Sequence, residues 1–159
     1  MYLPDFIGPS NPNSRLKPKV SSSRTMAFQR GDQVEVLNKE EGFEGSYFPA
    51  YIISRISYNE YIVQYKTLVK GDGSGPLREV FSTDKIRPKP REIVATDYCL
   101  SEVVDAYANE GWWVGKIIRK MGSKYLVYFE SSNEETPYPL HRLRVHQEWR
   151  DGVWEYSKK

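Results

Sequence analysis

The chain contains the same pattern of short apolar segments twice, and this internal repeat constrains the fold more than any other feature. The matching segments occur in the same order, and their differences in length fall between them. Residues 34–36 match 104–106, 47–53 match 112–118, 61–65 match 125–129, and 86–87 match 143–144. The sequence therefore indicates two related modules.

The repeat divides the 159 residues into four parts. We place the first module at 28–90, the second at 91–150 and a C-terminal tail at 151–159. Residues 1–27 contain four prolines, a run of serines and almost no periodic apolar pattern. Such a composition cannot bury enough surface to offset the entropy lost on ordering. We expect this segment to be a flexible, disordered basic arm.

The repeated segments have the composition of β-strands. Short runs rich in β-branched and aromatic residues are separated by glycine and asparagine turns, and no window of helical length shows a 3.6-residue apolar period. In the first module the expected strands are 33–37, 48–56, 61–65 and 80–81. A sheet of this size is stable only if it curls and buries one face, and a module of about 60 residues is marginal alone. We therefore predict an all-β fold of two small, bent antiparallel barrels packed in tandem.

The charge balance favours a basic peptide over a nucleic acid as partner. The formal net charge is only +2, which is not the strongly basic signature of a nucleic-acid-binding domain. The second module, over 91–149, carries seven basic and nine acidic residues. Pairs of glutamates at 40–41 and 134–135 would attract a basic peptide and repel a phosphate backbone.

Several other classes of function lack a sequence signal. Cys99 is the only cysteine, and the two histidines show no metal-ligand spacing, so we expect no metal and no cofactor. No motif supplies an activated nucleophile or an acid–base pair, so we expect no enzyme. No stretch approaches the roughly 20 apolar residues of a membrane span, and the start lacks the order of a signal peptide. We expect an intracellular, soluble and monomeric cassette.

Two adjacent tryptophans in the second module raise a specific question. Neighbouring side chains on a strand point to opposite faces, so only one of Trp112 and Trp113 can easily belong to the core. One interpretation is that both pack within a thin barrel. The other is that Trp113 is an exposed binding surface, while Trp112 packs on the opposite face, against the other module.

The sequence resembles the plant Agenet domain, a Tudor-like member of the Royal superfamily, present here as a tandem pair. The segments that carry the resemblance are "GDQVEV" at 31–36, "EEGFEGSYFPAYII" at 40–53, "EGWWVGKII" at 110–118 and "LRVHQEWRDGVW" at 143–154. The resemblance implies a bent antiparallel barrel in each module. It also implies a reader of methylated lysine on histone tails, acting on chromatin in the nucleus.

In Tudor-like folds, methyl-lysine is held by an aromatic cage at one open end of the barrel. Carried onto the second module, the resemblance implies that Tyr107, Trp113 and Phe129 form this cage, with Glu130 beside it. Aromatic faces attract a methylammonium without having to satisfy hydrogen-bond donors. Two further carboxylates, Glu110 and Glu134, lie near these positions in the sequence and would contact the basic peptide.

The first module departs from the cage pattern at one position. The corresponding residues are Leu37, Phe48 and Tyr65, and Leu37 is not aromatic. Phe43, in the loop after the first strand, is a candidate replacement. The same loop contributes Glu40 and Glu41 as expected acidic contacts for the peptide. The second module is the stronger candidate because it has three aromatic walls.

Two other functions remain open at this stage. One is binding of RNA or another single-stranded nucleic acid, because bases can stack on exposed aromatic rings and a local basic run lies nearby. That run consists of Lys116, Arg119, Lys120 and Lys124. The other is a protein-interaction scaffold in which the cassette is only a rigid platform.

Overall fold

The computed structural model describes residues 27–38 and 45–156. Most of them lie in β-strands or in the turns between them, an irregular segment at 89–102 joins the two modules, and the described residues include no α-helix. The expected N-terminal arm lies, except for its last residue, outside the described residues. Within the described ranges, no helix is long and apolar enough to span a membrane.

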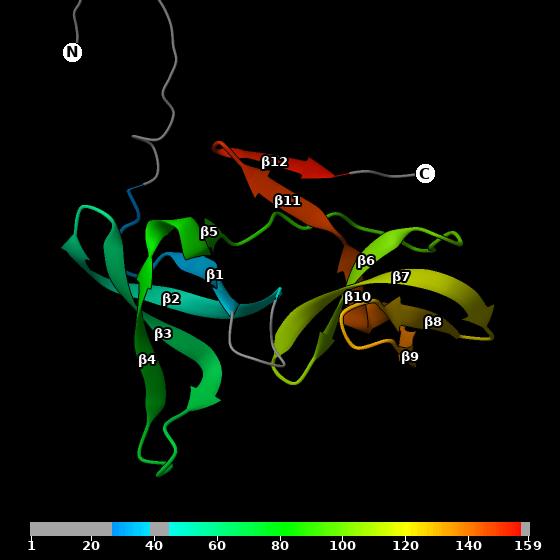
Figure 1. Ribbon diagram of the computed structural model, residues 1–159, viewed down its shortest axis with the longest axis horizontal. Coiled ribbons are helices and arrows are strands. Elements are labelled where there is room, and N and C mark those ends of the chain that lie inside the picture. Colours follow the sequence, from blue (N-terminus) through cyan, green and yellow to red (C-terminus); the bar gives the residue numbers. More distant parts are fainter. Residues whose placement is uncertain (1–26, 39–44, 157–159) are drawn as a thin grey trace, which may run out of the picture.

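The first module is an antiparallel meander that folds back on itself (Figure 1). Strands β1 to β4 pair in sequence order, and a short 3-10 turn at Thr83–Lys85 returns the chain so that β5 pairs with β1. The strands are β1 Gln33–Asn38, β2 Ser46–Ser57, β3 Glu60–Val69, β4 Pro76–Ser82 and β5 Ile86–Pro88. The strand expected at 80–81 is longer than predicted because its pairing with β3 extends back to Pro76.

The second module repeats this arrangement. Strands β6 to β9 pair in sequence order, and a 3-10 turn at Leu140–Arg142 returns the chain so that β10 pairs with β6. The strands are β6 Val103–Ala108, β7 Gly111–Met121, β8 Lys124–Phe129, β9 Glu134–Pro139 and β10 Leu143–Val145. The predicted all-β fold of two small antiparallel units in tandem is therefore confirmed.

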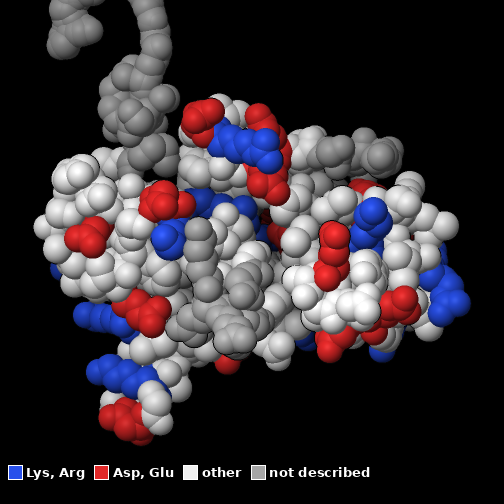
Figure 2. Space-filling model, in the orientation of Figure 1, with Lys and Arg blue, Asp and Glu red and all other residues white. Residues whose placement is uncertain are grey.

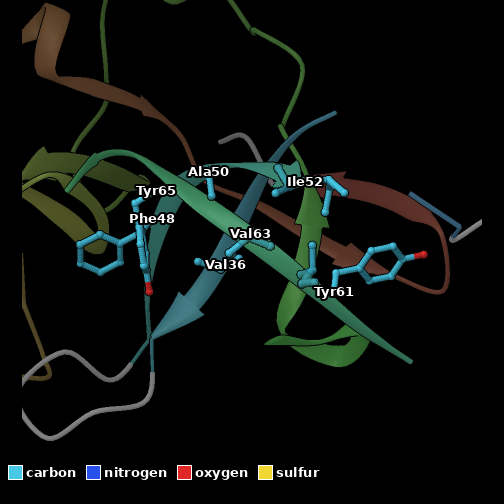
Figure 3. Close-up of a cluster of buried hydrophobic side chains, with 9 residues drawn as sticks. Val36, Phe48, Ala50, Ile52, Tyr61, Val63 and Tyr65 are labelled. Atoms are coloured by element: carbon cyan, nitrogen blue, oxygen red, sulfur yellow. The ribbon is translucent and has the colours of Figure 1, made fainter. Parts of the chain in front are cut away.

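Each module has its own apolar core. Side chains alternate between buried and partly exposed along β2, as expected for a strand with one face toward a core. Figure 3 shows the first core, in which Phe48 and Tyr65 lie together at one end and Tyr61 at the other. The second core includes Val104, Ala106, Ile117 and Val127, with Trp113 packed against its margin.

The two modules share one continuous sheet. Strand β2 pairs with β7 at a single position, Tyr47 opposite Trp112, which are matching residues of the repeat. The strand order across this joint is β10-β6-β7-β2-β1-β5, so equivalent strands follow one another outward on both sides. Antiparallel contact between equivalent residues is the arrangement of a two-fold interface. The modules are therefore related approximately as the subunits of a symmetric dimer.

A close packing contact reinforces this joint. Gly111 at the start of β7 is buried, and a Cβ atom placed on it would lie 3.0–3.2 Å from three ring atoms of Phe48 in the first module. A side chain at this position would press on the phenyl ring, which would have to shift by a few tenths of an ångström. Phe48 thus belongs to the first core and also meets the second module.

Beside the joint lies a buried group of charged side chains, which we call the charge cluster: Glu35, Arg87, Asp105, Arg144 and His146. Both oxygens of the Glu35 carboxylate accept hydrogen bonds, from Arg87 Nη2 at 2.8 Å and from Arg144 Nη1 at 2.8 Å. Arg144 also donates to Asp105 through Nε at 2.9 Å. Glu35 is only 2% exposed, and its two arginine partners come from different modules. The cluster therefore ties the two modules together.

Aromatic rings cover the guanidinium groups of the cluster. The Arg87 guanidinium lies 3.5 Å from the centre of the Tyr47 ring, and that of Arg144 lies 4.0 Å from the Trp112 ring. Each arginine thus stacks on the aromatic residue of its own module at the β2–β7 joint. Such stacked cation–π contacts stabilise a charge that has been removed from water.

A β-hairpin comes after β10 (Figure 1), and its side chains contact the charge cluster. Its strands are β11 Gln147–Arg150 and β12 Val153–Tyr156. Trp149 and Trp154 contact each other across the hairpin, and Trp154 lies 5.0 Å from the Arg87 guanidinium. The region from 151, which the sequence suggested to be a tail, thus contributes a paired strand up to residue 156.

His146 connects this hairpin to the cluster. Its Nδ1 lies 2.7 Å from Asp105 Oδ1, and its Nε2 contacts Glu148 on β11. Burial disfavours the charged imidazolium, but hydrogen bonds and attraction from Asp105 and Glu148 outweigh it and raise the pKa of His146. Burial likewise opposes ionisation of Asp105, yet its bonds with His146 and Arg144 lower its pKa.

We predict that Gly111→Ala destabilises the chain by about 1–3 kcal/mol, because the added methyl group crowds the Phe48 ring and makes it shift within a packed core. The control is Gly71→Ala, where a Cβ would meet nothing within 4 Å and φ is not positive. Urea denaturation measures the free energy of unfolding of both variants. In a Phe48→Leu background the cost of Gly111→Ala should shrink, and an undiminished cost would contradict the proposed clash.

We also predict that His146 makes stability fall as pH rises above neutrality. A folded-state pKa above the unfolded value of about 6.5 contributes stability that is complete below that value and is lost as pH rises through the folded-state pKa. The free energy of unfolding, measured from pH 6 to 9, should decline less in His146→Gln than in the wild type. His141→Gln, at an exposed histidine, should keep the wild-type slope. Equal slopes in the wild type and His146→Gln would contradict this role.

Candidate functional site

The second module has an open pocket with aromatic walls. Its volume is about 350 Å³. Three rings line it, from three successive strands: Trp113 of β7, Phe129 of β8 and Tyr138 of β9. The remaining lining is small or polar and consists of Ala108, Asn109, Ser131, Ser132, Glu134 and Thr136.

A tight turn fixes the orientation of Trp113. Strands β6 and β7 are joined by two residues, Asn109 and Glu110, with φ angles of 51° and 66°. Positive φ at both positions is typical of a two-residue hairpin turn of type I′. The turn brings the carbonyl of Ala108 to 2.7 Å from Trp113 Nε1, which donates a hydrogen bond to it. The indole nitrogen is therefore satisfied, and the ring is held at the pocket wall.

The other two rings are held by each other and by the β8–β9 ladder. Phe129 and Tyr138 meet edge to face, with centroids 6.0 Å apart and an interplanar angle of 82°. Burial is the main cause of a raised pKa of Tyr138, so its phenol stays neutral at physiological pH. Glu134 lies directly opposite Phe129 in the ladder, and its side chain shares that face. The pocket thus combines three ring surfaces with one carboxylate.

The structure brings only some of the predicted cage residues together. Trp113, Phe129 and Glu134 line the same pocket, whereas Tyr107 lies elsewhere. The Tyr107 ring packs against Trp112, with centroids 5.0 Å apart, on the side of the sheet that faces the first module. Adjacent strand residues face opposite sides, which separates Tyr107 and Trp112 from Ala108 and Trp113.

The other two carboxylates predicted for the second module do not line the aromatic pocket. Glu130 lines a separate shallow depression with Val114 and Tyr128. Glu110 is exposed in the β6–β7 turn.

The internal repeat could have identified Tyr138, the third ring of the pocket, from the sequence. Counting back five residues from Leu143 gives Tyr138, and counting back five from the matching Ile86 gives Phe81. Phe81 packs edge-on against Tyr65 at 6.3 Å, as Tyr138 does against Phe129. An aromatic residue therefore recurs at this position in both modules.

In the first module the corresponding rings are engaged in packing. Phe48 and Tyr65 are both buried and meet edge to face at 6.1 Å. The Tyr65 hydroxyl donates a hydrogen bond of 2.6 Å to Glu79 Oε1. Phe43, Glu40 and Glu41 lie outside the described residues.

Metal ligation has no basis in the part of the chain that the structure describes. There, no group of three or more histidine, cysteine, aspartate or glutamate side chains is arranged to hold an ion. The pocket residues themselves offer one carboxylate, hydroxyl groups and rings. This arrangement is suited to binding a cation with apolar substituents.

Comparison with known proteins identifies the family. The Agenet domain model matches residues 31–91. The Arabidopsis thaliana protein AGENET DOMAIN (AGD)-CONTAINING P1 is 39% identical over 150 residues, covering 92% of this chain and 29% of that protein. Arabidopsis DUF724 domain-containing protein 3 is 38% identical over 138 residues, covering 82% of this chain and 20% of that protein. The chain thus spans less than a third of the length of these relatives.

Solved structures agree with this assignment. The crystal structure of Arabidopsis thaliana AGDP1 AGD34 superposes with a TM-score of 0.79 at 33% identity, covering 85% of this chain and 92% of that one. The structure of the ADCP1 tandem Agenet domain 3-4 superposes with a TM-score of 0.75 at 31% identity, covering 85% and 91%. This chain therefore belongs to the Agenet domain family and carries two Agenet domains in tandem.

Proposed function

We propose that the chain is a non-catalytic chromatin reader whose second Agenet domain binds a methylated lysine of a histone tail. Agenet domains are modules of the chromatin-reader type, which bind peptides or proteins. The observation that carries the finer proposal is the pocket formed by Trp113, Phe129 and Tyr138 with Glu134 at its edge.

The chemistry of methylated lysine matches this lining. Methylation preserves the positive charge of the ammonium group but removes hydrogen-bond donors and adds apolar surface. A ring face attracts such a cation by about 0.5–2 kcal/mol, and tryptophan gives the strongest attraction. Three rings around one side chain would therefore favour the methylated form over plain lysine, which loses more hydration on entering the pocket.

The carboxylate adds selection for charge. Among the described residues, Glu134 is the only carboxylate that lines the pocket, and it is exposed. A negative charge beside the rings favours a cation over a neutral side chain of the same shape. The adjacent Glu135 lies opposite Tyr128 and faces the other side of the sheet. It offers a matched comparison for the effect of charge alone.

A histone ligand would place this function on chromatin in the nucleus. The tail is basic, and the acidic excess of the second module would attract it. The chain matches less than a third of the length of the curated relatives, so any effector activity of a longer protein lies beyond this proposal. The aromatic pocket itself offers binding and no bond-breaking chemistry.

We predict that a histone-tail peptide with trimethylated lysine binds at least about tenfold more tightly than its unmethylated form. Glu134→Gln should weaken binding of the methylated peptide several-fold, because it keeps the shape and removes the charge. Glu135→Gln is the matched control and should stay near the wild type. Isothermal titration calorimetry measures the affinities of the wild type and of both variants for these peptides. Equal affinity for methylated and unmethylated peptides would contradict the proposal.

We predict that Tyr138→Ala costs about 2- to 30-fold in affinity for the methylated peptide, the equivalent of one lost cation–π contact. Tyr107→Ala removes an aromatic ring that does not line the pocket and should have a smaller effect. Thermal unfolding of each variant shows whether a loss of affinity comes from a loss of fold. If folded Tyr107→Ala loses more affinity for the methylated peptide than Tyr138→Ala does, the binding site lies on the other side of β7.

A further inference from the structure

A second cavity lies between the two modules, behind the aromatic pocket. Its volume is about 390 Å³, and both modules contribute to its lining. Trp112 and Tyr107 line this cleft, whereas their neighbours Trp113 and Ala108 line the aromatic pocket. The two cavities therefore lie back to back across the β6–β7 ladder. Neither uses the side chains that line the other.

The cleft offers positive charge without free negative charge. Among the described residues that line it, Glu35 is the only acidic one, and its oxygens are already bonded to Arg87 and Arg144. Lys66 and Lys89 are exposed and make no ion pair with any described residue. A ligand that enters this cleft would therefore meet cations at its rim.

Arg142 adds a third cation whose position is fixed. Its Nε donates a hydrogen bond of 2.9 Å to the carbonyl of Tyr107, while its two Nη atoms make no hydrogen bond to a described residue. The guanidinium is thus oriented by the protein and still has donors for a ligand. Its Cζ atom lies 5.8 Å from the centre of the Tyr107 ring.

One face of the molecule shows no broad basic area. On the face shown in Figure 2, basic and acidic side chains are interspersed over both modules, without a large area of one sign. The chain as a whole is nearly neutral. The visible face and the low net charge thus give no sign of a general attraction for polyanions, and the cations of the cleft are the candidate contacts.

Half-buried aromatic rings line the same cleft, namely Tyr51, Tyr107 and Trp112. Cations that follow a phosphate backbone, combined with rings on which bases stack, are the two components of sites for single-stranded nucleic acid. A phosphorylated peptide is typically held by converging arginines. Here two of the three unpaired cations are lysines, and the three come from separate elements, so the composition favours a nucleic acid.

We propose that the inter-module cleft binds a short segment of single-stranded RNA or DNA. Phosphates contact Lys66, Lys89 and Arg142, and bases stack against Tyr51 and Tyr107. This site is separate from the proposed methyl-lysine pocket and does not depend on it. Because the cavities lie on opposite faces of one ladder, a nucleic acid and a peptide can occupy the chain together.

The test measures fluorescence anisotropy of labelled oligouridine and oligothymidine, each about ten nucleotides long, with the full chain. The double variant Lys66→Glu and Lys89→Glu should bind at least tenfold more weakly. The matched control, Arg119→Glu and Lys124→Glu, makes the same charge change at exposed positions outside the cleft and should stay within about twofold of the wild type. The slope of log affinity against log salt should fall by about 1.4 for two lost phosphate contacts.

A second pair of variants tests stacking. Tyr51→Ala should weaken oligonucleotide binding at least about fivefold, as expected for loss of one stacked base. Tyr58→Ala, at a residue that is 83% exposed and outside the cleft, should have no effect. Comparison of the two oligonucleotides decides between RNA and DNA. The affinity should be unchanged in Glu134→Gln, which separates this site from the peptide pocket.

Three outcomes would overturn the proposal. One is the absence of oligonucleotide binding at about 50 mM salt. Another is equal weakening by both charge-reversal pairs, which would mean general electrostatic attraction. The third is binding of a phosphoserine peptide that Lys66→Glu and Lys89→Glu abolish, with oligonucleotide binding left intact. None of these three results depends on whether the methylated peptide binds.

Discussion

A single buried carboxylate holds the two Agenet domains in one arrangement. Glu35 lies between Arg87 of its own domain and Arg144 of the other, and almost none of its surface reaches solvent. Removing one partner of a buried ion pair costs about 3–5 kcal/mol, because the remaining charge is left uncompensated. A buried pair adds little net stability compared with apolar packing, but in some proteins it selects one geometry over others. We infer that the cluster has this role here and sets how the domains meet.

This arrangement explains the adjacent tryptophans. The joint requires Trp112 to face the first domain, where it pairs with Tyr47 across β2 and β7 and carries the Arg144 guanidinium on its ring. Since strand residues alternate, Trp113 must then face away from the joint, toward the pocket with Phe129 and Tyr138. The same alternation creates a cavity on each side of the ladder. One has a carboxylate beside its rings, and the other has cations.

The sequence predicted the fold well because the repeat and the two-residue period are local signals. The resemblance to the Agenet domain implied that Trp113 and Phe129 share a cage with Glu134 nearby, and the structure brings these three into one pocket. Tyr107 was assigned to the cage because of its position at the end of a strand. A shift of one residue along a strand moves a side chain to the other side of the sheet, and Tyr107 lies on the side opposite the pocket. Tyr138 required the repeat to be followed into the fourth strand of each module. The charge cluster was hidden because its ion pairs join residues up to 109 positions apart. The sequence held one sign of this cluster: an acidic residue within an apolar strand of each module, Glu35 and Asp105, and an arginine at matching positions of the repeat, Arg87 and Arg144.

The central claim is that the charge cluster makes the two domains one structural unit. Differential scanning calorimetry of the wild type and Glu35→Gln tests it most directly, with Glu135→Gln as the exposed control. The wild type should show one cooperative transition, with equal calorimetric and van't Hoff enthalpies. Glu35→Gln should lower the melting temperature sharply or split the transition in two, while Glu135→Gln should keep the wild-type melting temperature. Two separate transitions in the wild type, or a Glu35→Gln variant as stable as the control, would contradict the claim.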